Sequence, residues 1–457
     1  MNAKRKRRVR GASLAALLAV VVAGSALAVT GCGGSSSGGE NVTVTFWWWG
    51  NDEAPGLRKW LQETVNKFEA SQSKIKVKTV EQTTDGLIQS AQAAQAAQKG
   101  PDIQYYWPVG WMQTDMFNEG LEPLDELLPD EVDHYPPAYR NYASFGGHVY
   151  AAPFYAIGNP WVYRKDLFAR AGLDPNNPPR TFDQFLAAGE KLKNAGIVPI
   201  AAGMKDQFYA DWPWMLWQAC GVDSPSQWFD AFLGKTSQGL EAPAYEQTWS
   251  KIDKTVRAGF YPSNVNSLTL YDGFNLLLQG KAAMATPVAP TTVTWARQLG
   301  SDKVGVMLTP CQGESSLAAK YPDASQYVAI PTFAKHKEEA AEFIAFMHTP
   351  DRMEALLKDA GAIMGDDRLP LDKVQDPVAK QEIQWTRDNA YFALYYTAPP
   401  TVDQWIWPNV GKIFGGDLAP AEAARIAQSQ NQAWLKKNRR LADDFEKWQP
   451  QVTGTEQ

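Results

Sequence analysis

The sequence predicts an α/β protein of two lobes, each a sheet flanked by helices. Three observations predict this class. Short alternating or apolar segments alternate with amphipathic helical segments, which is typical of α/β lobes with a largely parallel sheet. The chain has 457 residues, more than a single hydrophobic core usually serves, so two domains are expected. No low-complexity linker follows residue 40, so the chain should cross between its lobes through ordered segments.

The first lobe begins with a strand, helix, strand, helix, strand pattern. Val42–Phe46 and Ile75–Val80 alternate apolar and polar residues, as strands do. Between them, apolar residues recur at helical spacing from Leu57 to Phe68. The Ala- and Gln-rich residues 87–98 favour a second helix, which the following Lys-Gly-Pro ends. Ile103–Trp107 is the third expected strand.

A second α/β segment begins near residue 155. Thr181 and Gln184 have the spacing of a capping box, and Gly196 supplies the stop of that helix. Residues 197–203 are expected to form a buried strand, and residues 335–348 an amphipathic helix. These segments build the scaffold and carry no chemistry.

The N-terminus has the layout of an export signal. Six basic residues precede an apolar run from about Leu14 to Val29, as in secretory signal peptides. The run ends at Val-Thr-Gly-Cys32, which resembles a bacterial lipoprotein signal and implies a lipid on Cys32. We expect residues 1–31 to be the signal peptide, residues 32–40 a flexible Gly/Ser tether, and the protein to be exported and lipid-anchored to the outer face of the bacterial cell membrane. An uncleaved anchor is the alternative, although the run is shorter than the ~20 residues of a spanning helix.

The net charge and the cysteine and histidine content indicate which ligands and which cross-links to expect. Residues 1–31 contain six basic and no acidic residues, so their removal changes the formal net charge from −6 to −12. A domain this acidic is not expected to bind nucleic acid. Cys220 and Cys311 can form a disulfide in an oxidising compartment or remain two buried thiols. The four histidines lack metal-ligand spacing, so we expect no metal and no cofactor.

Several stretches occur in an order typical of one family. They are KGPDIQYYW, GLEPLDELL, GHVYAAPFYAIGNPWVYRKDLFARAGLDPNNPPRTFDQF, FYADWPWMLWQACG, LLLQGKAAMATP and KHKEEAAEFIAFMHTPD. With the first strand, which ends in tryptophan and acidic residues, they cover residues 42 to about 440. The chain therefore resembles the family 1 extracellular solute-binding proteins of carbohydrate ABC importers, which are maltose-binding-protein-like. It departs from them at residues 324–327, where Ala-Ser-Gln-Tyr stands in place of a frequent Gly-Gly, and in PVAPTTVTW after the GKAAM stretch.

The resemblance implies a two-lobed periplasmic-binding-protein-like fold (type II) that closes by hinge motion on a ligand in the cleft between its lobes. Residues 41–152 and 327–368 would form lobe 1, and residues 153–326 and 369–450 lobe 2. The resemblance also implies a sugar or oligosaccharide ligand, an ABC transporter permease as partner and no enzymatic activity. We expect a monomer.

Aromatic residues beside polar ones mark the expected cleft. An indole can cover the apolar face of a pyranose, while carboxylates and amides pair with its hydroxyls. Ligands of α/β sheets bind at the carboxyl ends of the strands, and the first strand ends in Trp47-Trp48-Trp49. Alternation turns Trp48 away from Trp49, and we expect Trp49 to face the cleft. The candidate ligand-binding residues are Trp49, Asn51, Asp52, Glu53, Trp107, Trp111, Tyr155, Asn159, Gln207, Tyr209, Asp211, Trp212, Trp214, Asp403, Trp405 and Trp407.

The resemblance assigns roles to part of this set. Stacking on carbohydrate is implied for Trp107, Tyr209, Trp212 and Trp405. Asp52 and Glu53 fall where polar residues accept hydroxyl groups. For each aromatic residue the alternative is packing, and for each carboxylate it is a solvated acid or a helix cap. Five other tryptophans are assigned to packing alone: Trp161, Trp217, Trp228, Trp249 and Trp448.

Two other functions stay open at the level of sequence. A secreted glycoside hydrolase would need two carboxylates flanking the scissile bond, and 50 acidic residues leave room for such a pair. A glycerophosphodiester or another polar solute is the alternative within the binding class. An anion would need Arg, Lys or a helix N-terminus in the cleft. The predicted cleft segments are richer in acids, and Lys205 and Arg297 are the cations near them.

Overall fold

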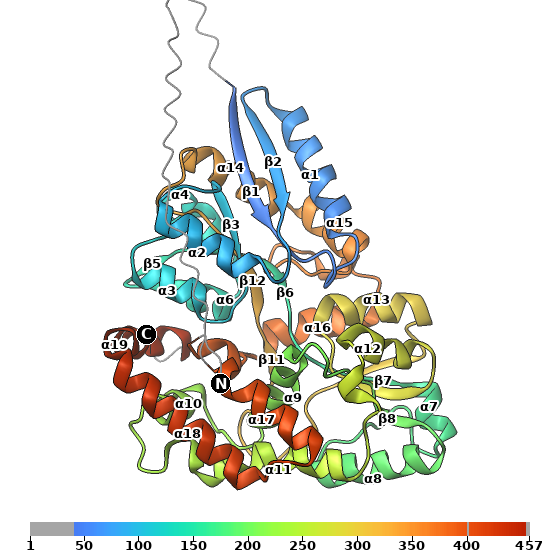
Figure 1. Ribbon diagram of the computed structural model, residues 1–457. Coiled ribbons are helices and arrows are strands. Elements are labelled where there is room, and N and C mark those ends of the chain that lie inside the picture. Colours follow the sequence, from blue (N-terminus) through green and yellow to red (C-terminus); the bar gives the residue numbers. More distant parts are fainter. Residues whose placement is uncertain (1–40, 400–401, 454–457) are drawn as a thin grey trace, which may run out of the picture. The chain divides into compact units, whose positions relative to one another are not determined.

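The computed structural model describes residues 41–399 and 402–453 of the chain (Figure 1). The predicted signal peptide, the tether and Cys32 lie outside these residues. Among the described helices, none combines the length and the apolar character that crossing a membrane requires.

Two larger sheets organise the described residues. The first has five strands in the order β2 (Ile75–Glu81), β1 (Val42–Trp48), β3 (Ile103–Tyr106), β12 (Ser325–Ala329) and β6 (Ala152–Ala156). Strands β2, β1 and β3 are parallel, and β12 runs antiparallel to its neighbours β3 and β6. The second sheet has four strands in the order β10 (Val304–Met307), β7 (Trp161–Arg164), β9 (Ala282–Ala285) and β8 (Val198–Ile200). Here β8 and β9 are parallel, and β7 is antiparallel to both of its neighbours.

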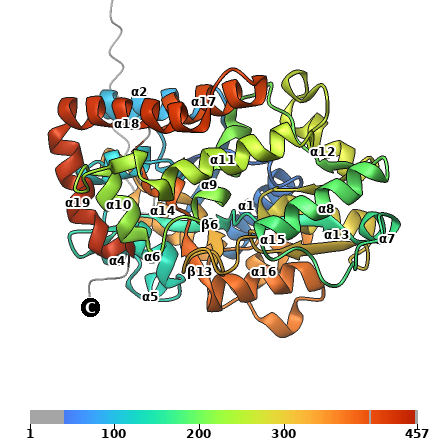
Figure 2. The same ribbon diagram turned by 90° about the horizontal axis from the view of Figure 1, so that it is seen from below.

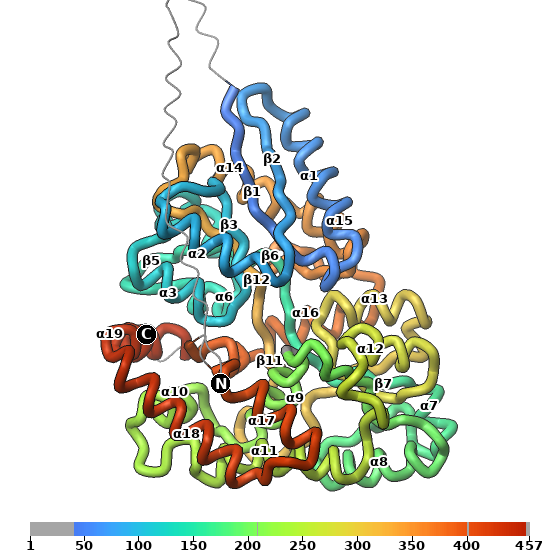
Figure 3. The backbone as a smooth tube through the Cα atoms, in the orientation of Figure 1, coloured from blue at the N-terminus to red at the C-terminus, as the bar shows by residue number. Residues whose placement is uncertain are grey.

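Two short strand pairs complete the described sheets. Strand β11 (Tyr321–Asp323) pairs with β13 (Ala390–Phe392), and β4 (Ser144–Phe145) pairs with β5 (His148–Val149). The chain can be followed in Figure 3 from β6 of the first sheet to β7 of the second. It returns to the first sheet through β11 and β12.

The predicted lobe boundaries can be compared with these strands. Residues 152/153 and 326/327 both fall within strands of the first sheet, β6 and β12. These strands lead directly into and out of the crossings, so a boundary read from sequence motifs falls inside them.

Helices surround both sheets. Those up to residue 257 are α1 (Leu57–Ser71), α2 (Leu87–Ala97), α3 (Trp111–Phe117), α4 (Leu124–Leu127), α5 (Pro129–Val132), α6 (Pro137–Tyr142), α7 (Lys165–Arg170), α8 (Phe182–Asn194), α9 (Asp211–Gln218), α10 (Pro225–Phe232) and α11 (Pro243–Arg257). The later ones are α12 (Leu270–Leu278), α13 (Ala289–Leu299), α14 (Lys337–Met347), α15 (Pro350–Ala360), α16 (Pro377–Asp388), α17 (Asp403–Gly415), α18 (Pro420–Lys437) and α19 (Arg439–Thr453).

The helix packing brings distant parts of the chain together. Helices α14 and α15 pack against α1 beside the first sheet, although more than 250 residues separate them in sequence. Helix α18 runs beside α11 (Figure 2). Helix α19 packs against α10 and α6, and its Phe445 also stands edge-on to Phe117 of α3, with ring centroids 5.2 Å apart. The C-terminal helices therefore contact elements from both halves of the chain.

Local sequence signals predicted these elements well. The first three expected strands and the two helices between them occur as β1, α1, β2, α2 and β3. The capping box of α8 is present, because Thr181 Oγ1 accepts from Gln184 N and Gln184 Oε1 accepts from Thr181 N. The five tryptophans assigned to packing are all buried in the core.

Cys220 and Cys311 form a disulfide in the structure, with their Cα atoms 5.7 Å apart. Cys220 follows α9, and Cys311 follows β10. The bond links two segments that are 91 residues apart in sequence. Of the two states that the sequence left open, the structure has the paired one.

Candidate functional site

A cavity of about 440 Å³ is lined by loops that follow strands of both sheets. The loops after β1, β2 and β3 contribute Trp49, Thr84 and Trp107. Residues that follow β8 and β9 of the second sheet also line it, among them Trp212 and Thr291. The volume lies within the roughly 300–1,000 Å³ of small-molecule sites. The location agrees with the rule that α/β sheets bind ligands at the carboxyl ends of their strands.

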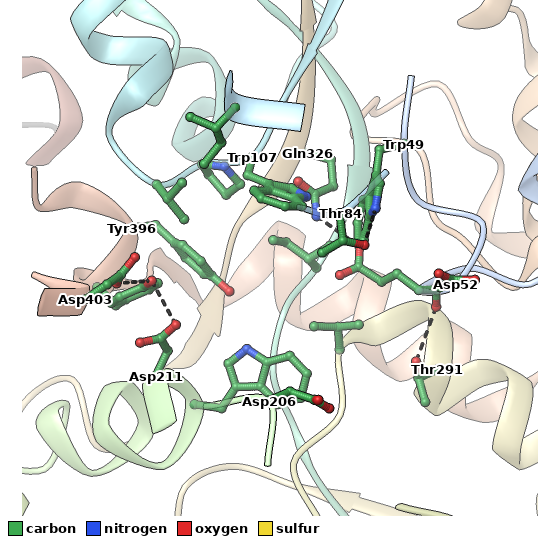
Figure 4. A pocket seen from close by; sticks show the side chains of 18 of the residues that line it. Trp49, Asp52, Thr84, Trp107, Asp206, Asp211, Thr291, Gln326, Tyr396 and Asp403 are labelled. Carbon is green, nitrogen blue, oxygen red and sulfur yellow. Dashed lines mark hydrogen bonds between the residues drawn. The ribbon is translucent and has the colours of Figure 1, made fainter. Parts of the chain in front are cut away.

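The tryptophan triplet divides its rings between core and cavity. Val44, Phe46 and Trp48 point into the core, and Trp48 is 2% exposed. Trp49 turns to the other side of the strand and lines the cavity. Its Nε1 donates to Thr84 Oγ1 at 2.9 Å, and its ring stands edge-on to that of Trp107 with centroids 5.1 Å apart. Two indoles from adjacent loops thus form one wall (Figure 4).

Glu53 connects several segments at the cavity. Its Oε1 accepts from Tyr155 Oη and from Gln326 Nε2, each at 2.9 Å. Its backbone carbonyl accepts from Thr291 Oγ1 of α13 at 3.3 Å. Burial raises the pKa of Glu53 to about 7, although the hydrogen bonds from Gln326 and Tyr155 act to lower it. Glu53 therefore ties the loop after β1 to both crossing strands and to a helix beside the second sheet.

A pair of acidic residues, Asp211 and Asp403, lies on another side of the cavity from Glu53 (Figure 4). Tyr395 Oη lies 2.9 Å from Asp211 Oδ2 and 2.7 Å from Asp403 Oδ1. Trp407 Nε1 donates to Asp211 Oδ1 at 2.7 Å. Burial, with the neighbouring carboxylate, raises the pKa of Asp211 far above its usual range, and burial raises that of Asp403 to about 6. The sequence predicted both carboxylates but not the tyrosine between them.

Helical spacing explains which tryptophans of two helices reach the cavity. On α17, Asp403 and Trp407 are four positions apart and share one face, and both line the cavity. Trp405 lies about 200° around the helix from Asp403 and packs against Trp214 and Trp249. On α9, Trp212 lines the cavity while Trp214, two positions later, is buried among Trp228, Trp249 and Trp405.

Eight of the sixteen candidate residues line the cavity. They are Trp49, Asp52, Glu53, Trp107, Asp211, Trp212, Asp403 and Trp407. The structure places the other eight elsewhere, although several support residues of the site. They are Asn51, Trp111, Tyr155, Asn159, Gln207, Tyr209, Trp214 and Trp405.

Each of the remaining candidates has another role in the structure. Asn51 accepts from the backbone N–H of Arg58 in the first turn of α1. The ring of Trp111 packs on Tyr106 at 4.3 Å, and Tyr155 acts through its hydrogen bond to Glu53. Asn159 is buried and donates to the carbonyl of Pro287.

Gln207 and Tyr209 belong to the loop before α9. Gln207 is exposed and has a φ of 60°, and Tyr209 stands edge-on to the cavity residue Trp212 at 5.9 Å. Tyr209 thus packs behind Trp212 of α9, whose ring lines the cavity.

Other lining residues were not predicted from the sequence. They are Thr84, Asp85, Ile88, Pro108, Val109, Ile157, Asp206, Tyr271, Phe274, Val288, Thr291, Gln326, Tyr395 and Tyr396. Thr84 and Asp85 follow β2 as Trp49 follows β1, so the strand-end rule could have found them. Gln326 stands in the stretch that departs from the family pattern. No local signal marks Tyr271 or Tyr395, because tertiary packing alone brings them to the cavity.

The cavity combines aromatic faces with hydrogen-bond acceptors and has no basic side chain among its described lining residues. Lys205 and Arg297 do not line it. Arg297 instead donates to the carbonyl of Lys358 and pairs with Asp376. Within the described part of the chain, no three or more histidine, cysteine or acidic residues are grouped so that they could hold a metal ion. Such a surface can stack on a ring and accept hydrogen bonds from its substituents.

Sequence comparisons point to one family. Residues 53–354 match the sequence model of a family described as bacterial extracellular solute-binding protein. An uncharacterized ABC transporter extracellular-binding protein of Pyrococcus horikoshii is 24% identical over 331 residues, 69% of this chain and 70% of the relative. The sn-glycerol-3-phosphate-binding periplasmic protein UgpB of Rhizobium meliloti is 25% identical over 218 residues, 44% of this chain and 48% of the relative.

Structural comparisons support the same fold. A chitin oligosaccharide binding protein superposes with a TM-score of 0.75 at 22% identity, covering 86% of this chain and 99% of the other. An ABC transporter solute-binding protein of Thermotoga lettingae, bound with α-D-tagatose, has a TM-score of 0.70 at 21% identity and covers 86% and 100%. These similarities confirm the two-lobed periplasmic-binding-protein-like fold.

Proposed function

Because the chain belongs to the bacterial extracellular solute-binding protein family, we propose that it captures a sugar or oligosaccharide and delivers it to the permease of an ABC transporter. It does so as a binding protein without enzymatic activity. The ligand lies in the cavity between the loops of the two sheets. Trp49, Trp107, Trp212 and Trp407 cover its apolar faces, and Asp52, Glu53, Asp211 and Asp403 accept its hydroxyl groups.

The composition of the cavity wall carries this proposal. Indole rings come from loops of the first sheet, at Trp49 and Trp107, and from helices near the second, at Trp212 and Trp407. Acidic side chains lie beside both groups of rings. Sugars need this combination, because the apolar ring face gains from burial while each unpaired hydroxyl would cost about 1–3 kcal/mol. Two proteins of the same fold bind chitin oligosaccharide and tagatose, which supports a saccharide as the class of ligand.

Capture requires the cavity to open and close. In this proposal residues 41–152 and 327–368 move against residues 153–326 and 369–450, with the strand crossings as hinges. A ligand takes a mostly open protein to a mostly closed one when it prefers the closed state by about 5.5 kcal/mol. Stacking on several rings together with paired hydrogen bonds from both sides can supply this preference. A lipid on Cys32 would keep the protein beside its permease on the outer face of the membrane.

Glycerol phosphate is a second candidate solute, because the chain is similar to UgpB over part of its length. Recognition of a phosphate usually relies on Arg, Lys or a helix N-terminus. The described lining of the cavity offers acidic side chains and no basic one. Carboxylates would repel the phosphate, so the charge of the cavity favours the saccharide.

Thermal unfolding of the protein without residues 1–39 tests the proposal. The panel holds neutral and amino mono-, di- and oligosaccharides together with glycerol 3-phosphate. A ligand at 100 times its dissociation constant should stabilise the protein by about 2.7 kcal/mol. We expect a shift with one saccharide class and recovery of that saccharide unchanged. A shift with glycerol 3-phosphate alone would move the assignment to that solute, and a cleaved oligosaccharide would show a hydrolase.

A further inference from the structure

The cavity has an unbalanced charge. Six carboxylates line it, at Asp52, Glu53, Asp85, Asp206, Asp211 and Asp403. Within residues 41–399 and 402–453, none of the six forms a salt bridge. Acidic residues elsewhere commonly do, as Asp366 pairs with Arg368 and Glu314 pairs with Lys251. The protein therefore leaves the acids of the cavity without a positive partner of its own.

One place where a positive group could bind is the cluster of Asp211, Tyr395 and Asp403. A phenol has one hydroxyl hydrogen, yet Tyr395 Oη lies within hydrogen-bond distance of both carboxylates. With both acids ionised, one of these contacts would have no hydrogen. In the free protein a proton on one carboxyl group satisfies the arrangement, and a cation bound beside the pair would allow both groups to ionise. Among the described residues, the Asp403 carboxyl group has Tyr395 Oη as its single hydrogen-bond partner, so it can accept from such a cation.

A further acceptor is unpaired at the cavity. Gln326 lines the cavity and is 2% exposed. Its Nε2 donates to Glu53, while its Oε1 has no hydrogen-bond partner among the described residues. A buried acceptor without a partner costs about 1–3 kcal/mol unless a ligand supplies a donor. A ligand that carries hydrogen-bond donors could therefore pair with this oxygen as well as with the carboxylates.

The aromatic wall suits the same ligand. The faces of tryptophan and tyrosine attract a cation within about 6 Å of the ring centre. Trp407 and Tyr396 line the cavity with Asp403, and Tyr395 lies between the two acids. A positive group beside Asp403 would therefore have aromatic rings as well as carboxylates among its neighbours.

We propose that the captured solute carries a basic nitrogen, as an amino sugar or an oligosaccharide with a free amine, and that its ammonium group lies beside Asp403 with Asp211 behind it. This inference rests on the proposed function and deepens it. The aromatic rings bind the sugar faces, while the acidic residues select for positive charge. A neutral sugar of the same shape leaves the acids unpaired and binds more weakly.

Matched saccharides test this selection. Each set contains a sugar with a hydroxyl, a free amine or an acetamide at the same carbon. Examples are glucose, glucosamine and N-acetylglucosamine, their galacto counterparts, and the corresponding β-1,4 disaccharides. Calorimetry at pH 6.5, where the amines are protonated, gives the dissociation constants. We expect the amine to bind at least tenfold tighter than both neutral forms in the set that binds best.

Two variants locate the selecting charge. Asp403→Asn and Asp211→Asn should each lower the ratio of amine affinity to neutral-sugar affinity at least tenfold, because the carboxamide oxygen still accepts from a hydroxyl group while the negative charge is lost. Asp443→Asn, on an exposed position of α19, is the control and should leave both affinities unchanged. A variant that fails to fold would show in its circular dichroism. In that case the amine-to-neutral ratio of the wild-type protein decides by itself.

The outcomes separate the two proposals. If a neutral form binds as tightly as the amine, the inference is overturned and the capture of saccharides stands. If Asp403→Asn and Asp211→Asn both fold and keep the full preference for the amine, the placement of the ammonium is wrong. If no saccharide binds in any form, the proposed function is wrong, and this inference, which depends on it, is wrong as well.

Discussion

Trp49 and Trp107 occupy fixed positions at the cavity wall. Trp49 is held by its hydrogen bond to Thr84 and by the ring of Trp107, which stands edge-on to it. Side chains already ordered in the free protein lose little freedom when a ligand stacks on them. The rings of the first sheet should therefore contribute strongly to affinity.

Removal of one of these rings should weaken binding without unfolding the protein. Trp107 is half-buried and lines the cavity. We expect Trp107→Ala to reduce the affinity for the bound saccharide by about 1.5–3 kcal/mol, because apolar area that the sugar would bury is lost. Calorimetry measures this loss. Trp47→Ala is the matched control, since Trp47 is also half-buried and does not line the cavity; equal losses in both variants would contradict the assignment.

Glu53 should make stability depend on pH. Its pKa is raised from 4.5 to about 7 in the folded protein, so the folded state holds this proton more tightly than the unfolded state. The free energy of unfolding should therefore fall as the pH rises from about 4.5 to about 7. The groups that interact with Glu53 through a hydrogen bond or its charge are Gln326, Tyr155, Tyr105, Tyr271 and Tyr396.

Glu53→Gln cannot titrate at this position and should lack this loss. We expect its stability relative to the wild-type protein to increase by about 2–3 kcal/mol between pH 4.5 and pH 7.5. Urea unfolding at a series of pH values measures the difference, and other buried acids such as Asp323 cancel in the comparison. Parallel profiles for the two proteins would show that Glu53 titrates normally.

Helices α9 and α17 each present one side to the cavity and the other to an aromatic core. Trp214 and Trp405 pack edge-on with centroids 5.6 Å apart, while Trp212 and Trp407 line the cavity. The same short stretch of helix thus packs into the core on one side and lines the cavity on the other. Which tryptophan has which role follows from its position around the helix axis.

The two tryptophans of α17 should respond differently to substitution. Trp405→Ala should lower the free energy of unfolding by about 3–5 kcal/mol, because it leaves a void in a buried aromatic cluster. Trp407→Ala should cost less than about 1.5 kcal/mol of stability and should weaken saccharide binding at least tenfold. Urea unfolding and calorimetry on both variants measure the contrast. A larger stability loss for Trp407→Ala would contradict the helix-face assignment.

The described residues as a whole form the cavity from loops and helices that follow strands of two sheets. Glu53 already bridges these parts, through Tyr155 and Gln326 on the crossing strands and Thr291 on α13. A ligand that contacts both sets of loops stabilises the closed form through its differential affinity for the two states. Binding and closure should therefore occur together.

Small-angle X-ray scattering can follow this closure. With a saturating amount of the saccharide that gives the largest thermal shift, we expect the radius of gyration to decrease, because the two lobes approach each other. Trp107→Ala at the same saccharide concentration is the control and should show a smaller decrease. An unchanged radius on saturation of the wild-type protein would mean that the ligand enters a cavity that does not close.

Local sequence patterns predicted the helices and strands named above and several of the side chains that line the cavity. Strand alternation, the capping box at Thr181 and the apolar spacing of α1 are local signals, and each gave the expected element. Trp49, Asp52 and Glu53 were predicted because they follow a strand at the carboxyl edge of a parallel sheet. The ordered motifs also predicted the family, which the family match confirms.

The contacts between these side chains depend on the packing of segments that are far apart in the sequence. Tyr395 lies between Asp211 and Asp403, and Gln326 reaches Glu53 across 273 positions of the chain. No periodicity links such residues, because their proximity depends on how β12 and the C-terminal helices pack against earlier elements. The unpaired charge of the cavity has the same origin. The amino-acid composition gives only the numbers of acidic and basic residues. The fold determines which acidic side chains lie beside a basic one.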